Sequence, residues 1–187
     1  MNATGMSHGY LELVMGPMFS GKTSKLLDLY KQYKYCNLNV VVINHSSDTR
    51  YSETMLSTHD KQMIPCIQTD NLKTIWDSMR PTFESADVVL INEGQFFNDL
   101  YEIVCSMLDE RKKIYVSGLD GDFQRKKFGQ ILDLVPLCDK VTKIASLCGI
   151  CKNGQAGIFS KRITQEAEQT LIGSDNYVPV CRKCYSL

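Results

Sequence analysis

Residues 16–23 read GPMFSGKT and match the pattern GxxxxGK followed by Ser or Thr. The stretch lies between an apolar run at 10–15, which predicts a strand, and a helical repeat of apolar residues at 24–35. In such a unit the glycines let the backbone curl with its amides inward, and the helix N-terminus adds positive potential. Lys22 would then contact the β and γ phosphates, and Thr23 would ligate magnesium. The sequence predicts a nucleoside triphosphate site; an ordinary glycine-rich turn is the alternative.

Short apolar runs rich in β-branched residues recur farther along the chain, at 40–43, 88–91 and 114–116. They show little polar alternation, as strands covered on both faces do. Helical patterns lie between them, at 72–79 and 100–110. This alternation predicts an α/β fold, with a mostly parallel sheet that carries helices on both faces.

The pattern changes after about residue 140, where Gly and Cys become frequent and the apolar runs shorten. We expect three parts: a flexible N-terminus at 1–9, a P-loop α/β domain at 10–143 and a small C-terminal lobe at 144–187. The polar segment 44–62 is long, and we interpret it as a functional or mobile loop.

The chain of 187 residues has 21 Lys and Arg and 21 Asp and Glu, so its formal net charge is zero. A global polybasic surface for nucleic acid or acidic membrane is therefore not expected. No run approaches the roughly 18 apolar residues of a membrane-spanning helix, and the N-terminus lacks the regions of a secretory signal. We expect a cytoplasmic protein without nucleic-acid or membrane partners.

A second part of the phosphate site is expected at 86–97, ADVVLINEGQFF, where polar residues follow a buried strand. P-loop proteins usually carry a magnesium-binding Asp at this strand end. Asn92 takes that place, so a neutral carbonyl oxygen replaces a carboxylate. Glu93 is then the carboxylate positioned to accept a proton from an attacking hydroxyl. A solvated turn carboxylate is the alternative for Glu93.

The eight cysteines point to disulfides or to metal ligands, and their spacing helps to separate the two. Cys148 and Cys151 form one CxxC, and Cys181 and Cys184 form another. Two such pairs make a tetrahedral site of four thiolates without an open position, so we expect a structural zinc ion. A redox CxxC or two disulfides are the alternatives. The other cysteines are interpreted as small core or surface residues: Cys36, Cys66, Cys105 and Cys138.

Together these motifs resemble those of the type II thymidine kinases, a zinc-containing family found in animals, many bacteria and large DNA viruses. The resemblance begins at about Gly9 and covers nearly the whole chain. The strings that carry it are GPMFSGKT, DTRYS and STHD within 48–60, INEGQFF at 91–97, LDGDFQRKKFGQILDLVPL at 119–137, FSKR at 159–162 and VCRKCY at 180–185. The C-terminal lobe should then hold zinc and carry the family's lasso loop.

The family phosphorylates the 5′-hydroxyl of thymidine or deoxyuridine with ATP and Mg²⁺, and the resemblance implies this activity here. Arg50 is implied as the cation on the transferring phosphate, since a guanidinium stays charged and grips oxygens bidentately. The implied catalytic residues are Glu93 as base, Arg50 and Lys22. The implied ATP and magnesium contacts are Gly16, Pro17, Met18, Phe19, Ser20, Gly21, Lys22, Thr23, Asp48, Asn92 and Gln95.

The base pocket follows from the same resemblance. Its implied walls are Met18, Phe96, Leu119, Phe123 and Phe128. The lasso loop, whose backbone would read the pyrimidine edge, is implied to include Gln169, Thr170, Leu171, Ile172, Gly173 and Tyr177. Apart from the resemblance, the alternative for the aromatic residues is a place in the core, since Phe is often buried; this concerns Phe96, Phe97, Phe123 and Phe128.

Three residues depart from the family's usual pattern: this chain has Asn92 in place of Asp, Asp122 in place of Thr and Lys127 in place of Pro. We expect Mg²⁺ to be held by Thr23, the ATP phosphates and Asp48, with Asn92 positioning a water. Feedback inhibition by dTTP and a homotetramer are implied by the resemblance alone.

Two other classes of function remain open. An ATP-hydrolysing zinc-ribbon protein acting on nucleic acid would need a basic groove, which the zero net charge does not favour. A non-enzymatic module could use the zinc lobe for protein contacts and the phosphate loop as a switch. ATP turnover that depends on thymidine would separate a kinase from both.

Overall fold

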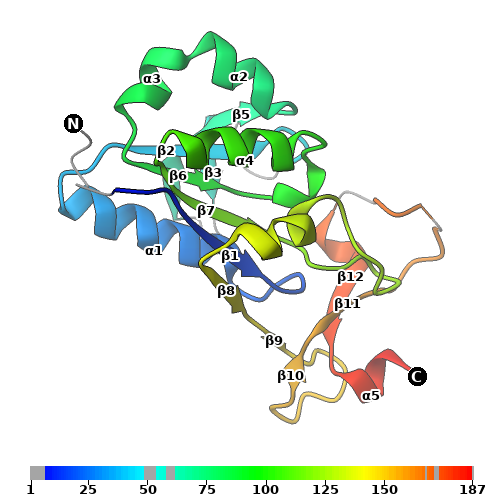
Figure 1. Ribbon diagram of the computed structural model, residues 1–187. Helices are drawn as coiled ribbons and strands as arrows, with labels where there is room; N and C mark the ends of the chain where they lie inside the picture. Colours follow the sequence, from blue (N-terminus) through cyan, green and yellow to red (C-terminus); the bar gives the residue numbers. More distant parts are fainter. Residues whose placement is uncertain (1–6, 49–53, 58–61, 167, 171–172, 187) are drawn as a thin grey trace.

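The computed structural model describes residues 7–48, 54–57, 62–166, 168–170 and 173–186. These form a central sheet, flanking helices and a smaller C-terminal lobe (Figure 1). Most of the segment 1–9, expected to be flexible, lies outside the described residues. No helix within them is long and apolar enough to cross a membrane.

Six strands pair in the order β5-β2-β6-β7-β1-β8, and every pair in this sheet is parallel. Their bounds are β1 Tyr10–Met15, β2 Val40–His45, β5 Ile67–Thr69, β6 Val88–Ile91, β7 Lys113–Gly118 and β8 Lys140–Lys143. The parallel α/β sheet predicted from the sequence is confirmed. Because the strands run one way, their carboxyl ends share one edge, where open α/β sheets bind ligands.

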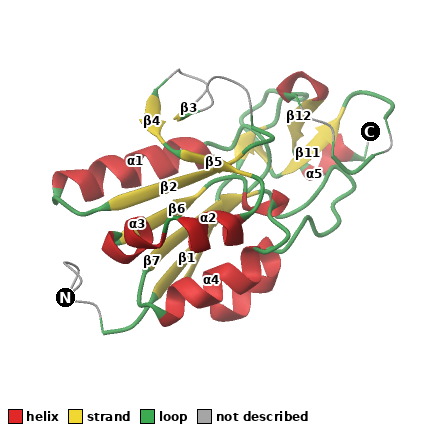
Figure 2. Cartoon of the chain, turned by 90° about the horizontal axis from the view of Figure 1, so that it is seen from above, coloured by secondary structure: helices red, strands yellow, loops and turns green. Residues whose placement is uncertain are grey.

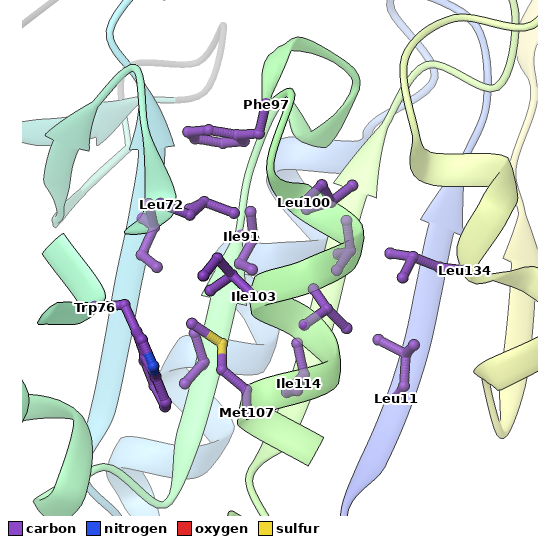
Figure 3. Close-up of a cluster of buried hydrophobic side chains, with 14 of the residues drawn as sticks. Leu11, Leu72, Trp76, Ile91, Phe97, Leu100, Ile103, Met107, Ile114 and Leu134 are labelled. Carbon is purple, nitrogen blue, oxygen red and sulfur yellow. The ribbon is translucent and has the colours of Figure 1, made fainter. Parts of the chain in front are cut away.

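Helices cover both faces of the sheet, as Figure 2 shows. On β6, Val88 and Leu90 belong to the core under α1, while Val89 and Ile91 belong to the opposite core (Figure 3). This strand is buried on both faces, which explains its unbroken apolar run. The helices are α1 Lys22–Tyr35 on one face, and α2 Leu72–Ser78, α3 Arg80–Ser85 and α4 Leu100–Asp109 on the other.

The interpretation of 44–62 as one loop is wrong in part. Asn44 and His45 complete β2, where both are buried despite their polarity. A short hairpin then pairs β3 (Met55–Ser57) with β4 (Met63–Pro65) in antiparallel register. Each of these strands buries only its middle residue, so neither has the length of apolar pattern that predicts a strand.

The residues after β8 form a small lobe with two hairpins. The first pairs β9 (Ser146–Leu147) with β10 (Ala156–Gly157), and the second pairs β11 (Phe159–Arg162) with β12 (Tyr177–Val180). The lobe lies beyond one end of the central sheet (Figure 2). The lobe also contains the helix α5 (Arg182–Tyr185). The 3-10 turns of the described chain are η1 Gly94–Phe96, η2 Ile131–Leu137 and η3 Ser174–Asn176.

Candidate active site

Residues 16–21, between β1 and α1, are called the glycine loop below. Its backbone takes positive φ at Phe19 (60°) and at Gly21 (86°). A Cβ on Gly16 would lie 2.2 Å from the backbone oxygen of Ile144, the residue after β8. Glycine is favoured at position 21 by the positive φ, and at position 16 because no Cβ fits there. The two glycines of the motif therefore serve different physical requirements.

Lys22 begins α1 with its charge inside the structure. Its side chain is buried, and Nζ donates a hydrogen bond of 2.7 Å to the carbonyl of Pro17 in the glycine loop. The first turn of α1 carries no acidic residue, so its positive end is not neutralised there. Thr23 follows in the same turn, half buried. The ammonium group, the helix end and the loop together form a positive site suited to phosphate.

A chain of polar side chains crosses the carboxyl ends of three adjacent strands. Ser117 Oγ lies 3.4 Å from Asn92 Oδ1, to which it donates. Asn92 Nδ2 donates to Asn44 Oδ1 at 2.9 Å, and Asn44 Nδ2 donates to Asp48 Oδ2 at 3.4 Å. Asn92 and Asn44 are each 1% exposed. The amide of Asn92 thus lies inside a neutral network that reaches the Asp48 carboxylate.

Glu93 directly follows Asn92 and adopts the left-handed conformation, with φ 54° and ψ 41°. Such backbone is uncommon for a residue other than glycine and concentrates at functional sites. Gln95 Nε2 donates to Glu93 Oε2 at 2.6 Å, while Gln95 Oε1 accepts from the amide of Leu119 at 2.9 Å. One buried amide side chain therefore connects the candidate base to the expected base pocket.

The phenylalanines differ in burial: Phe97 and Phe128 are buried, and Phe96 and Phe123 are half buried. Phe97 is fully buried, so the core alternative holds for this residue. Phe96 is half buried and meets Phe128 edge to face, with ring centroids 5.5 Å apart. The ring centroids of His45 and Phe96 are 5.3 Å apart. Burial lowers the imidazole pKa of His45, although nearby carboxylates oppose the change. A mostly neutral, aromatic wall results.

The C-terminal lobe contacts the glycine loop directly. The amide of Met18 donates to Ser160 Oγ of β11 at 2.9 Å, and Ser160 is buried. Sequence reasoning did not single out Ser160, and its only signal is its place in the string FSKR. Of the residues implied for the lasso loop, Gln169, Thr170 and Gly173 are exposed. Three lie outside the described residues: Arg50, Leu171 and Ile172.

The four cysteines of the two CxxC pairs come together. Their sulfur atoms all lie within 4.8 Å of one another, and three of the four residues are buried. Every cysteine is a free thiol within the described chain, which does not support the disulfide alternative. Four thiolates from two tight turns are the donor set of structural zinc sites, and such a site leaves no ligand position for a substrate.

Thiol acidity in the cluster also suits a cation. Burial alone would raise the pKa of Cys148, but backbone amides donating to its sulfur, led by Cys151 and Cys181, lower it to about 6. Burial and the neighbouring thiols raise the pKa of Cys184 to about 12. One sulfur is therefore readily ionised, and a divalent ion would favour deprotonation of the others.

Comparison with known proteins agrees with this arrangement. A family model described as thymidine kinase matches residues 9–185. The chain belongs to the thymidine kinase family. The thymidine kinase of Sheeppox virus (strain KS-1) is 40% identical over 183 residues, covering 97% of this chain and 99% of the relative. That of Oryza sativa subsp. japonica is 39% identical over 189 residues, covering 99% and 69%.

The thymidine kinase of Vaccinia virus (strain Ankara) is 40% identical over 181 residues, covering 96% of this chain and 98% of the relative. Family membership makes the chain an enzyme of the kinase class. The resemblance inferred from the motifs is therefore confirmed at the level of the family.

The cysteine cluster generates a stoichiometric prediction. Cys184→Ser should lose most of the zinc bound by the wild-type chain, since the hydroxyl replaces one of four thiolate ligands. Zinc per chain, measured by mass spectrometry of the metal after desalting, should be about one for wild type. Cys36→Ser, which changes an exposed cysteine away from the cluster, should keep that value. Full zinc in Cys184→Ser would contradict the assignment.

Proposed function

We propose that this family member transfers the γ-phosphoryl group of ATP to the 5′-hydroxyl of thymidine, and that it also accepts deoxyuridine. The observation that carries the proposal is the position of Glu93. It follows β6, Leu119 follows β7 and the glycine loop follows β1, and these are adjacent strands of one parallel sheet. A carboxylate, a pocket wall and a phosphate-binding loop therefore share one edge.

The proposed reaction is a direct in-line transfer without a covalent enzyme intermediate, because phosphoryl transfer depends mainly on positioning and charge. Glu93 accepts the proton of the 5′-hydroxyl, with Gln95 orienting the carboxylate through its 2.6 Å hydrogen bond. Lys22 and Arg50 balance the charge on the transferring group. Magnesium, when bound with ATP, would neutralise phosphate charge and would be held by Thr23 and Asp48, with Asn92 positioning a water.

The proposal extends to the rest of the molecule. Residues 10–143 would be the kinase domain and residues 144–187 the zinc lobe, whose lasso reads the pyrimidine edge. Structural Zn²⁺ would supply no chemistry to the reaction and would hold the lobe together. We also propose a cytoplasmic homotetramer that is inhibited by dTTP, which would combine nucleoside and phosphate contacts in one ligand.

Substrate choice is tested by incubating the zinc-loaded protein with radiolabelled ATP, Mg²⁺ and each natural deoxynucleoside. Label should appear in thymidine and deoxyuridine monophosphates and should be absent with purine deoxynucleosides. A failure to label any pyrimidine nucleoside would refute the proposal. If DNA stimulated ATP hydrolysis instead, the result would favour an ATPase that acts on nucleic acid. Binding of ATP without turnover would favour a non-enzymatic module that uses the phosphate loop as a switch.

Glu93→Gln should lower kcat by about 10² to 10⁴, the usual contribution of a positioned general base. The amide keeps the size of the side chain, so the KM for thymidine should change little. Steady-state kinetics measures both quantities. Glu102→Gln, an exposed change on α4, should retain wild-type kcat. A kcat for Glu93→Gln within about tenfold of the parent would remove Glu93 as the base.

Asn92→Asp should lower the Mg²⁺ concentration that gives half-maximal rate, because it adds a negative charge beside the proposed magnesium site. The change is nearly isosteric, although the carboxylate could no longer donate to Asn44. Magnesium titration of the initial rate measures the shift, with exposed Asn98→Asp as the matched control. An unchanged magnesium requirement and rate would show that Asn92 has no role toward the metal.

A further inference from the structure

Arg162, at the end of β11, is a buried cation that binds backbone carbonyls. Its side chain is 8% exposed. Nη1 donates to the carbonyl oxygens of Glu166, at 2.8 Å, and of Glu168, while Nη2 donates to that of Gln169 at 3.2 Å. Nη2 also donates to the hydroxyl of Tyr177, the first residue of β12. The guanidinium thus joins the segment after β11 to the start of β12.

The same guanidinium lies against a residue of the expected base pocket. Arg162 Cζ is 3.8 Å from the centroid of the Phe123 ring, within the range of a cation–π contact. Tyr185 of α5 donates its hydroxyl to the carbonyl of Phe123 at 2.7 Å. One face of the ring and its backbone are therefore fixed by the C-terminal lobe. A nucleoside base could stack only on the opposite face.

Asp122 provides a second attachment for the same segment. It is 7% exposed, and Oδ1 accepts from the amides of Gln124 and Lys126 at 2.9 Å each. Oδ2 accepts from Gln169 Nε2 at 2.8 Å. One carboxylate thus closes the turn after Phe123 and holds Gln169 beside it. A charged acceptor strengthens each of these hydrogen bonds.

The Nε–H group of Arg162 is buried without a hydrogen-bond partner among the described residues. An unpaired buried donor lowers stability. The side chain is therefore not arranged for fold stability alone. Its two terminal nitrogens instead donate to three carbonyls and one hydroxyl, whereas an ammonium has only three N–H donors.

The alternation of β11 separates two kinds of contact. Ser160 and Arg162 are two residues apart and both buried, while Lys161 between them donates to the carbonyl of Cys184 at 3.1 Å. Ser160 reaches Met18 of the glycine loop, on the phosphate side of the site. Arg162 reaches the carbonyls after β11 and Phe123. A change at Arg162 should therefore affect the nucleoside side and leave the ATP side intact.

We infer that Arg162 and Asp122 are positioning residues, which hold Glu166, Glu168 and Gln169 and the Phe123 ring in the geometry that binds the nucleoside. The inference rests on the proposed function. It assigns thymidine affinity, rather than ATP affinity or the chemical step, to the planar guanidinium of Arg162 and to the carboxylate of Asp122.

Arg162→Lys is the main test, since it keeps the charge and loses the fork. The KM for thymidine should rise about tenfold or more, while the KM for ATP should stay within about twofold. Hydrogen exchange of the substrate-free protein should become faster in peptides covering 163–170. Arg182→Lys is the matched control, because Arg182 is exposed on α5 and lies 5.2 Å from the Phe159 ring.

Gln169→Ala removes only the hydrogen bond to Asp122 and leaves Arg162 unchanged, so it tests the inference if Arg162→Lys loses zinc or unfolds. It should raise the KM for thymidine about fivefold without changing the KM for ATP. Equal thymidine KM and equal exchange in the Arg162→Lys and Arg182→Lys variants would overturn the inference. A wild-type enzyme that phosphorylates no nucleoside would instead overturn the proposed function on which it rests.

Discussion

The close approach of Gly16 to Ile144 is the constraint on which the site depends. β1 pairs with β8 on one side and β7 on the other, and the amide of Ile144 donates to the carbonyl of Met15 at 2.8 Å. The chain turns into the glycine loop directly after this pair, where a Cβ on Gly16 would lie 2.2 Å from the Ile144 oxygen. A larger residue would force β8 away from β1. The pairing of β1 with β8 and the path of the glycine loop thus both require a glycine at position 16.

The electrostatics of this edge are unusual because a buried amide lies where P-loop proteins usually carry a carboxylate. The side chain of Asn92 is hydrogen-bonded on both of its polar atoms, since it donates to Asn44 and accepts from Ser117. A buried carboxylate would need compensation from a nearby cation or metal. The neutral network satisfies its own polar atoms. Close to Asn92, negative charge is carried by Asp48, which accepts from Asn44, and by Glu93, the residue that follows Asn92.

The sequence predicted those parts in which one residue pattern decides the structure. The unbroken apolar run of β6 and the local motif of the glycine loop are of this kind. The two CxxC pairs also lie together in the structure, as their spacing predicted. Edge strand β8, Lys140–Lys143, is largely exposed and has no apolar run, so only pairing with β1 defines it. Arg162 could not be found in this way, because its carbonyl partners lack any side-chain signature.

The cysteine cluster and the glycine loop are physically connected through β11. Cys181 lies between β12 and α5, as the N-cap of that helix, and Lys161 of β11 donates to the carbonyl of Cys184. On the opposite side of the same strand, Ser160 accepts from the glycine-loop amide of Met18. A short antiparallel hairpin is marginal by itself in water, so its register must be fixed by what it contacts. A metal-bound cysteine cluster on one side and the glycine loop on the other would fix the register of this hairpin. A metal ion that takes no part in the reaction would thereby help to shape the site.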